Sequence, residues 1–309
     1  MIKKKRYSDY NTYLRQLFGQ RVQKISIDSG LSCPNRDGAL SRKGCIYCNS
    51  KGSGSGLFAK GLSITKQIEA NKIGAVKKYK AKKFLAYFQS YSNTYTSCEH
   101  MKQMFDEALC CEGMVGMAVG TRPDCIDEEK LDLIESYTKD YLVWLEYGLQ
   151  SVHDPTLATI NRGHTVKDYF DTVQLTMGRN INICTHVILG LPGEDKNMML
   201  ETAKILSDSN INGIKLHLLY VIKGTILDNM WQKGEYHPLE QNEYVELVCD
   251  FLEILPKNII IQRITGDPHA EELQAPMWAG RYRETFNMIQ DTLEKRDSYQ
   301  GIKGLHKKN

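Results

Sequence analysis

Residues 84–124 read FLAYFQSYSNTYTSCEHMKQMFDEALCCEGMVGMAVGTRPD, and this stretch contains the pattern that decides the fold. Two short apolar runs, 84–88 and 115–119, are rich in residues that favour β-strands. The segment between them, 98–110, has the composition and spacing of a helix. A strand, a helix and a second strand in this order form a unit in which both strands run parallel in one sheet.

The same alternation extends over most of the chain. Further strand-like runs lie at 24–27, 142–147, 183–189 and 214–220, with a seventh candidate at 259–264. Helix-like stretches separate them at 64–79, 128–139, 166–177, 197–208 and 239–255. Six or seven such units without a two-fold break predict an α/β fold, a partial (β/α)6 barrel of the TIM type, and a doubly wound sheet is the alternative. We expect an N-terminal segment over 1–20, the barrel over 21–265, and a short helical C-terminal extension over 266–309 packed on the barrel.

Composition narrows the class of protein. The chain has 309 residues, of which 41% are hydrophobic and 25% charged, as in an ordinary globular protein. No apolar run approaches the roughly 18 residues that span a membrane, and no apolar segment follows the basic N-terminus as in an export signal. These observations predict a cytoplasmic protein without a membrane partner. In that reducing compartment clustered cysteines indicate metal binding or redox chemistry, and scattered ones fill the core.

Basic residues are unevenly distributed, although the net charge is only +3. Local blocks occur at 3–6, at 77–83 (KKYKAKK) and at 303–308. Each block fits a solvated surface or a chain end, and each also fits a surface that contacts a phosphate backbone.

Three cysteines share a polar loop after the first predicted strand. Cys33, Cys45 and Cys48 have the spacing C-x11-C-x2-C. Thiolates suit iron–sulfur clusters and zinc, and three of them leave one iron of a four-iron cluster open for chemistry. A zinc knuckle completed by Cys98 or a histidine, and unrelated core cysteines, are the alternatives.

The loop resembles the cluster loop of the radical S-adenosylmethionine (SAM) superfamily, although the usual spacing there is C-x3-C-x2-C. The longer first gap resembles one branch, the YhcC/YtqA-like proteins, which are related to the radical SAM domain of Elongator protein 3. The similar segments run in order along nearly the whole chain. They are ISIDSGLSCPNRDG (25–38), YFQSYSNTY (87–95), GTRPDC (120–125), EYGLQS (146–151), NRGH (161–164), HVILGLPGE (186–194), LLYVIKGT (218–225) and RDSYQG (296–301).

This resemblance implies a [4Fe-4S] cluster on Cys33, Cys45 and Cys48, with S-adenosyl-L-methionine bound at the open iron. One electron from a donor such as flavodoxin or ferredoxin then cleaves the sulfonium. The product, a 5′-deoxyadenosyl radical, abstracts a hydrogen atom from the substrate. In such enzymes the cofactor supplies the chemistry, and the protein orients it and excludes water.

The resemblance also implies which residues contact SAM. Each of these positions has a plain structural alternative, which is a loop anchor, a strand cap, an internal ion pair, a surface salt bridge (for Arg162), a turn glycine or core packing. The positions are Tyr47 near the adenine, Gln89 and Ser90 near the methionine amino group, Glu146 and Gln150 at the end of the fourth strand, Arg162 for the methionine carboxylate, and Gly190, Tyr220 and Val221 near the adenine.

Arg122 and Asp124 in GTRPD follow the third predicted strand and point to the same end of the barrel, so they are candidates for catalysis or binding, or for an internal ion pair. Cys125 is a candidate hydrogen donor, and a buried structural cysteine is the favoured alternative. His186 and His217 lie within strands, where a hydrogen-bonded core histidine is more common than a metal ligand.

The branch resemblance implies the substrate. YhcC/YtqA-like proteins are associated with bacterial tRNA modification, at the C5 tail of the wobble uridine, from carboxymethylaminomethyl toward methylaminomethyl forms. The basic blocks agree with an RNA partner, and exposed anticodon bases stack on aromatic side chains. A radical enzyme acting on a small metabolite or a protein, and a non-catalytic metal-cluster protein that binds RNA, are the alternatives.

Overall fold

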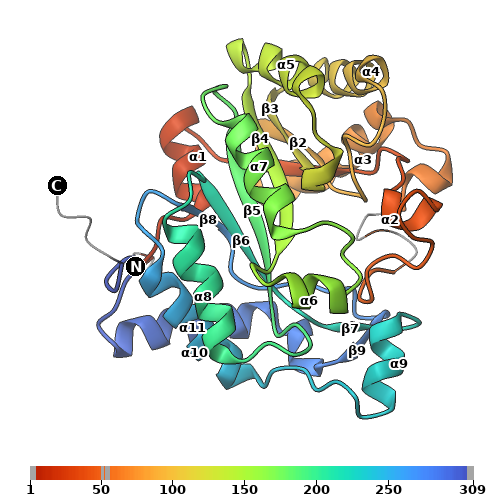
Figure 1. The fold of residues 1–309 in the computed structure, drawn as a ribbon. Helices are drawn as coiled ribbons and strands as arrows, with labels where there is room; N and C mark the ends of the chain where they lie inside the picture. Colours follow the sequence, from red (N-terminus) through yellow and green to blue (C-terminus); the bar gives the residue numbers. More distant parts are fainter. Residues whose placement is uncertain (1–4, 50–51, 53–55, 305–309) are drawn as a thin grey trace.

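The computed structural model describes residues 5–49, 52 and 56–304. Its central element is a parallel seven-stranded sheet that curls into an open barrel, with helices on the outer face (Figure 1). Neighbouring strands follow the order β1-β2-β3-β4-β5-β6-β8, without the reversal that defines a doubly wound sheet. The predicted partial barrel is therefore confirmed, and the seventh strand candidate belongs to it.

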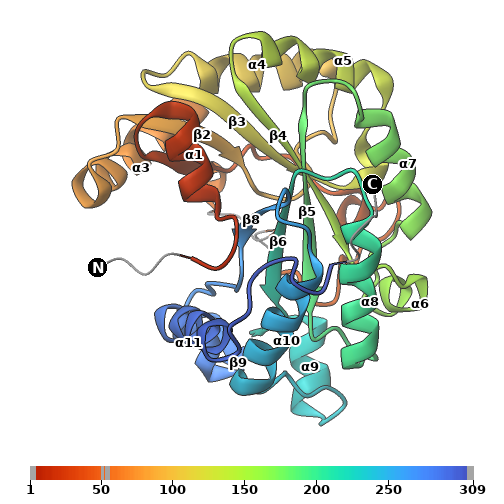
Figure 2. The same cartoon turned by 90° about the vertical axis from the view of Figure 1, so that its left-hand side faces the viewer.

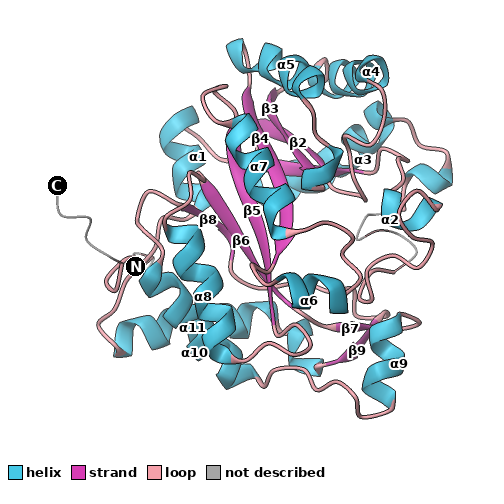
Figure 3. Cartoon of the chain, in the orientation of Figure 1, coloured by secondary structure: helices cyan, strands magenta, loops and turns pink. Residues whose placement is uncertain are grey.

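The elements alternate along the chain as Figure 3 shows. The strands of the main sheet are β1 (Val22–Ile27), β2 (Lys83–Phe88), β3 (Met114–Thr121), β4 (Leu142–Gln150), β5 (Asn182–Leu189), β6 (Gly213–Leu218) and β8 (Ile260–Arg263), and β7 (Val221–Ile222) pairs with β9 (Leu273–Ala275) in a small antiparallel sheet. The helices are α1 (Tyr10–Phe18), α2 (Pro34–Asp37), α3 (Ile64–Tyr79), α4 (Cys98–Leu109), α5 (Glu128–Ser136), α6 (Asp154–Thr159), α7 (Val166–Thr176), α8 (Lys196–Ser207), α9 (Ile226–Gln232), α10 (Gln241–Ile254) and α11 (Tyr282–Lys295). Short 3-10 helices lie at Phe58–Lys60, Pro123–Cys125, Tyr137–Lys139 and Met277–Gly280.

Side-chain caps fix where the helices begin. Ser63 accepts a hydrogen bond from the backbone of Lys66 and starts α3 at the predicted residue. Thr165 and Asp168 form a reciprocal capping box at the start of α7. Such caps satisfy amide groups that have no partner within the helix, so the local sequence sets these boundaries. In the described part of the chain, no helix is long and apolar enough to cross a membrane.

Helix α1 closes the amino-terminal end of the barrel, and the sequence did not predict this helix. Its buried residues Tyr10 and Leu14 pack into a cluster with Val22 of β1, Trp144 of β4 and Cys184 of β5. The Tyr10 and Trp144 rings meet edge to face, with their centroids 5.5 Å apart. An apolar plug of this kind removes side chains from water at one end of the barrel and leaves the carboxyl ends of the strands open.

The barrel does not close between its first and last strands. Residues before α1 partly cover the free edge of β8, where the amide of Ile261 donates to the carbonyl of Ser8 at 2.8 Å and Asp9 forms an isolated parallel bridge to Ile261. Covering an edge in this way hides groups that would otherwise pair with another chain. Figure 2 shows α1 and α11 on either side of β8, where this seam lies.

A layer of charged and polar side chains crosses the inside of the barrel above the plug. The Glu146 carboxylate in β4 accepts from Lys24 at 2.8 Å, from His186 at 2.9 Å, and from Lys215. Lys215 also donates to the Tyr87 hydroxyl at 3.0 Å. Burial alone would raise the pKa of Glu146, but the charges of Lys215 and Lys24 outweigh it and hold that pKa well below its usual value. We call these residues the lumen network.

The position of Glu146 corrects one expectation. The sequence placed it at the end of the fourth strand, whereas β4 extends to Gln150 and Glu146 lies in its middle, 1% exposed. The strand is longer than expected because Gly148–Gln150 continue it across a register shift opposite β5. All the described hydrogen bonds of this carboxylate are to residues of the lumen network. Glu146 thus has the internal ion pair that was the alternative to a contact with SAM. Tyr220 likewise lies beyond β6, which ends at Leu218.

The C-terminal region packs on the barrel through α10 and α11. Arg296, at the end of α11, donates to Asp250 at 2.9 Å and to Glu253 at 3.0 Å in α10. Gln300 accepts from the amide of Ser8 and donates to the carbonyl of Ile259, which ties both ends of the chain to β8. The RDSYQG segment therefore fastens the last helix and the N-terminal segment to the seam.

Replacing Glu146 with glutamine should lower the free energy of unfolding by about 3–5 kcal/mol, because the buried Lys215 and the partly buried Lys24 lose their counter-charge. Urea denaturation followed by circular dichroism measures this. The matched control is Glu135→Gln, whose carboxylate meets Arg179 at the surface and is 37% exposed. That change should cost less than about 1 kcal/mol. Equal, small losses in both variants would show that the lumen network does not stabilise the barrel.

Candidate active site

The three predicted cluster cysteines lie on the loop that leaves the carboxyl end of β1. Cys33 is the residue before α2, whose first residue is Pro34. Cys45 and Cys48 enclose a tight turn in which the amide of Cys48 donates to the carbonyl of Cys45 at 3.0 Å. The C-x2-C spacing thus corresponds to a tight turn that presents two thiols. Backbone hydrogen bonds of Ile46, between them, fix this turn to Ile160 and Leu227.

Hydrogen-bond donors surround these sulfur atoms. The side-chain amide of Asn35 and the Nη1 atom of Arg162 each lie 3.7 Å from the Cys45 sulfur. Arg36 donates to the carbonyl of Cys48. Burial, followed by the neighbouring Cys45, raises the pKa of the Cys48 thiol to about 11, and Cys33 adds to this effect. The three thiols are thus close enough for one to influence another, and a metal that binds them must displace protons.

The donor set fits an iron–sulfur cluster. It consists of soft sulfur ligands with amide and guanidinium donors directed at them, which stabilise negative charge on cluster and ligand sulfur. Among the described residues, no three His, Cys, Asp or Glu side chains form a compact group that could hold an ion. The assignment of the cluster site therefore depends on the chemistry of the three thiols and on their position in one loop, because the described side chains do not form a preorganised metal site.

The end of β2 supplies the predicted contacts to the methionine amino group. Ser90 is fully buried, and its hydroxyl has no hydrogen-bond partner among the described residues. An unpartnered buried hydroxyl is costly, so this atom fits a ligand contact. Gln89 accepts from the Ser26 hydroxyl at 3.2 Å. Asn93 holds this strand end in place, because its amide donates to the carbonyls of Phe88, Ser90 and Gly120.

Arg162 is packed under the end of β4. Its Nη2 atom donates to the carbonyl of Gly148 at 2.7 Å. A Cβ atom on Gly148 would lie 2.5 Å from that nitrogen, so only glycine admits the guanidinium. Gln150, at the strand end, has the left-handed backbone angle φ of +79°, which is costly for a side-chain-bearing residue and often marks a functional site. Within the described chain Arg162 meets a sulfur atom and carbonyl groups, not a carboxylate, and its role toward methionine stays a prediction.

Arg122 and Asp124 form a two-pronged ion pair. The Arg122 Nε atom lies 2.9 Å from Asp124 Oδ1, and its Nη2 atom lies 2.7 Å from Oδ2. Nη1 of Arg122 donates to the carbonyl of Arg162, which links the GTRPD and NRGH segments. Cys125 is 6% exposed, and burial raises the pKa of its thiol to about 11. The geometry gives all three residues a structural role at the barrel mouth, and their roles in catalysis stay predictions.

Two of the predicted adenine contacts, Tyr47 and Val221, lie at a second apolar cluster beside the mouth. Val221 is fully buried in it, and Tyr47 packs against it. Burial, followed by the nearby Cys45, raises the pKa of Tyr47, so the phenol stays protonated beside the thiols. Gly190 has a φ of +88°, and its carbonyl accepts from the Tyr236 hydroxyl at 2.9 Å. Tyr220 lies apart, against the main core and Gly266.

Sequence reasoning missed several residues of this site. Asn35 and Asn93 lie in the quoted segments, but their types suggest a turn rather than contacts to sulfur or to strand ends. Lys24 and Lys215 could have been found, because a charged residue at an inward position of a buried strand is rare without a partner. His186 is hydrogen-bonded as expected, whereas His217 Nε2 has no partner among the described residues.

Comparisons with known proteins agree with this geometry. The model of the Radical SAM superfamily matches residues 38–206, and that of the Radical_SAM C-terminal domain matches 211–295. The chain belongs to the radical SAM superfamily. Members of this family use a [4Fe-4S] cluster and S-adenosyl-L-methionine, so the predicted cofactors are confirmed at the level of the family.

The branch is confirmed as well. The chain is 40% identical to the uncharacterized protein YtqA of Bacillus subtilis, over 96% of this chain and 92% of that one. It is 38% identical to protein YhcC of Escherichia coli, over 86% of this chain and 85% of that one. A tRNA uridine(34) acetyltransferase of Methanocaldococcus jannaschii is 31% identical over 50% of this chain and 28% of its own length.

A solved structure shares the fold of this radical SAM chain. It is the archaeal Methanocaldococcus infernus Elp3 with an N-terminal deletion, with a TM-score of 0.68 and 18% sequence identity. The likeness covers 90% of this chain and 64% of the other. At this identity the comparison concerns the arrangement of strands and helices.

The buried histidines predict a pH dependence of stability. Burial, followed by the charge of Arg162, lowers the pKa of His164 to about 3, and burial with Lys215 lowers that of His186 to about 4. The unfolded chain binds these protons near pH 6.5 and the folded chain does not. Stability is therefore full above about pH 6.5 and falls as the pH drops toward 4, by up to about 1.4 kcal/mol per pH unit for each histidine.

Urea unfolding at a series of pH values between 7 and 5 measures this slope. His164→Gln should reduce it, because one proton-binding group is lost from the unfolded chain. The exposed His100 is the matched control, and His100→Gln should leave the slope unchanged. A slope that His164→Gln does not alter would contradict the neutral, buried state of that imidazole.

Proposed function

We propose that this radical SAM enzyme modifies tRNA, at the C5 tail of the wobble uridine, in the conversion of carboxymethylaminomethyl toward methylaminomethyl forms. The observation that carries this proposal is the similarity to a protein named as a tRNA uridine(34) acetyltransferase. That similarity spans 28% of the relative. The proposal therefore concerns the tRNA substrate and not acetyl transfer.

The chemistry suits such a tail. When bound, the cluster and SAM supply a radical that attacks an unactivated carbon–hydrogen bond beside nitrogen. The residues of this chain hold and orient the participants. Cys33, Cys45 and Cys48 would hold the cluster. Ser90, whose hydroxyl has no partner among the described residues, would contact the methionine end, and Tyr47 and Val221 would contact the adenine. A cytoplasmic location and an electron donor of the flavodoxin or ferredoxin type complete the proposal.

A basic surface near the barrel seam supports an RNA partner. Lys77 and Lys78 lie in the last turn of α3, Lys82 precedes β2, and Lys83 begins it. Lys77, Lys78 and Lys82 are exposed. The ammonium group of Lys78 lies 5.1 Å from the centre of the Tyr79 ring. Exposed lysines around an aromatic ring suit a phosphate backbone with nearby bases. Of the other two basic blocks, at 3–6 and 303–308, residues 3–4 and 305–308 lie outside the described residues.

Total tRNA from a strain that lacks this enzyme should stimulate formation of 5′-deoxyadenosine by the reconstituted, reduced protein. Mass spectrometry of the tRNA nucleosides should show a parallel mass change in a wobble uridine. Cys45→Ala should abolish both signals with the fold retained, because the cluster loses a ligand. Cys110→Ala, at an exposed cysteine on another surface, is the matched control and should keep both.

Two results would contradict this proposal in different ways. Slow cofactor cleavage that tRNA does not alter would keep the radical chemistry and transfer the search to small molecules or proteins. Full activity of Cys45→Ala would contradict the assignment of the cluster ligands.

Replacing Lys77, Lys78 and Lys82 together with glutamate should weaken tRNA binding at least about tenfold at low salt. The slope of log affinity against log salt should become shallower by up to about three, one for each lost phosphate contact. Lys80 stays in place because its left-handed backbone ends α3. The matched control reverses three exposed lysines elsewhere, Lys139, Lys204 and Lys233. Equal affinities in both variants would remove this block from the tRNA interface.

A further inference from the structure

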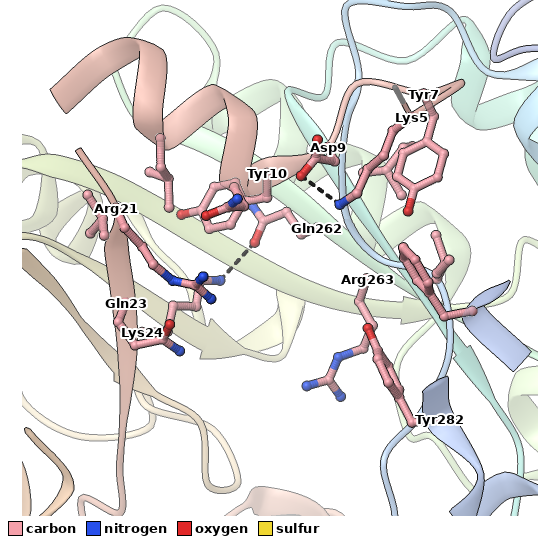
Figure 4. A pocket seen from close by; sticks show the side chains of 16 residues that line it. Lys5, Tyr7, Asp9, Tyr10, Arg21, Gln23, Lys24, Gln262, Arg263 and Tyr282 are labelled. Atoms are coloured by element: carbon pink, nitrogen blue, oxygen red, sulfur yellow. Dashed lines mark hydrogen bonds and ion pairs between the residues drawn. The ribbon is translucent and has the colours of Figure 1, made fainter. Parts of the chain in front are cut away.

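A cavity of about 260 Å³ lies in the seam of the barrel, between the edge strands β1 and β8. Helix α1, the segment before it and helix α11 form its other walls, as Figure 4 shows. It lies away from the cluster loop, and none of the residues that the family resemblance implies for SAM lines it. We call it the seam cavity.

Cations outnumber carboxylates on its walls. The cationic residues are Lys5, Arg21, Lys24 and Arg263, and the single carboxylate is that of Asp9. Lys5 is paired with Asp9 at 2.9 Å. Lys24 is shared by the lumen network and Gln262. For Arg21 and Arg263, no ion pair or hydrogen bond is found within the described part of the chain. Figure 4 shows the Arg263 guanidinium beside Tyr282, with no interaction drawn to it.

Buried polar atoms without partners gather in the same place. The Tyr10 hydroxyl, the Arg21 Nε atom and the Gln262 Nε2 atom are all buried and lack a hydrogen-bond partner among the described residues. Tyr10 is only 9% exposed. Such atoms are rare in folded proteins because each lost hydrogen bond is costly. The excess of cations on the walls, with two guanidinium groups that have no ion pair among the described residues, indicates an anionic ligand.

Aromatic rings line the outer part of the cavity. Tyr282 and Phe286 on α11 form one wall, and Tyr7 adds a third ring. The Tyr282 and Phe286 rings are nearly parallel, 19° apart. Tyr282 is 40% exposed, so its face is accessible from solvent. Guanidinium groups beside accessible aromatic faces are the combination that binds a phosphate and a stacked base.

The seam cavity connects two regions already described. On the inner side, Lys24 lines the cavity, and its ammonium group donates a hydrogen bond to the Glu146 carboxylate of the lumen network. Outward, the Arg21 guanidinium lies 4.0 Å from the centre of the Tyr79 ring, in the basic segment that ends α3. A strand of RNA bound along that segment would meet the mouth of the cavity next.

We propose that the seam cavity binds one nucleotide unit of the substrate RNA, with its phosphate on Arg263 and its base against Tyr282 and Phe286. Arg21, at the opposite side of the cavity, contacts another phosphate of the same strand. The volume lies just below the roughly 300–1,000 Å³ of small-molecule sites, which suits a single nucleotide and excludes a folded RNA element. The RNA source of the ligand rests on the proposed function. The shared chemistry, a phosphate beside a planar base, also admits a free nucleoside monophosphate.

The test measures binding of two probes to the full-length protein: an anticodon stem-loop RNA with a wobble uridine, and uridine monophosphate. Arg21→Gln and Arg263→Gln should each weaken RNA binding about five- to tenfold and lower the salt slope by about one. Arg263→Lys, which keeps the charge, should restore part of the affinity. Tyr282→Leu should weaken binding about tenfold without altering the salt slope, because it removes stacking and not charge.

Arg283→Gln is the matched control, since Arg283 is exposed on the same helix as Tyr282 but does not line the cavity. It should bind RNA within twofold of the unchanged protein. Thermal unfolding of each variant verifies that the fold is retained. As a second measurement, p-benzoylphenylalanine in place of Phe286 should cross-link to the RNA, and in place of Phe170 on α7 it should not.

The outcomes separate the two proposals. RNA binding that the lysine reversal weakens but the Arg21, Arg263 and Tyr282 variants do not would overturn the seam cavity and keep the RNA substrate. Binding of uridine monophosphate but not RNA, sensitive to Arg263→Gln, would support a nucleotide site and overturn the proposed substrate. If neither probe binds the unchanged protein, the seam cavity is not a nucleotide site.

Discussion

The carboxylate of Glu146 joins strands that are far apart in the sequence. It accepts from Lys24 of β1, His186 of β5 and Lys215 of β6, while its own strand, β4, lies between them. An open barrel has no strand pairing across its seam, so contacts through its interior must hold the first strand near the last ones. The charges of Lys24 and Lys215 keep Glu146 ionised, and its carboxylate offsets part of the cost of burying their ammonium groups. The rest of the barrel depends on this arrangement.

The lumen network also separates the amino-terminal end of the barrel, which is packed with apolar side chains, from the carboxyl-terminal end, which carries the candidate site. Below it, α1 fills the interior with apolar rings and makes one end solid. Above it, the strand ends carry polar groups held by a second set of bonds, in which Asn93 joins β2 to β3 and Arg122 joins β3 to the loop that holds Arg162. Arg162 in turn reaches Cys45 of the cluster loop. Rigid strand ends therefore position a loop that the sequence alone leaves free, as expected for sites on a barrel.

The barrel also has an open seam between β1 and β8. A closed barrel would pair β1 with β8 and bury Arg21 and Arg263 away from water, which is costly for an unpaired charge. With the seam open, these cations line a cavity whose mouth adjoins the basic end of α3. The cluster loop and the seam cavity are thus separate features of one barrel, one at the carboxyl ends of the strands and one at its side.

Much of this was determined by the sequence itself. Alternating apolar runs and helical stretches predicted the seven strands and the barrel, because hydrophobic periodicity and caps act over a few residues. The thiol spacing and the quoted segments predicted the superfamily, which the comparisons confirm. The cluster ligands and the region of SAM binding stay predictions. Only the tertiary structure decided that Glu146 lies mid-strand in an ion network, that Arg162 meets a sulfur atom, and that α1 plugs the barrel. It alone also placed Arg21 and Arg263 on the walls of one cavity, although they are 242 positions apart in the numbering (263 − 21). Local patterns specify elements, whereas the partners of a buried charge are set by which strands become neighbours in space, and no short stretch of sequence records that.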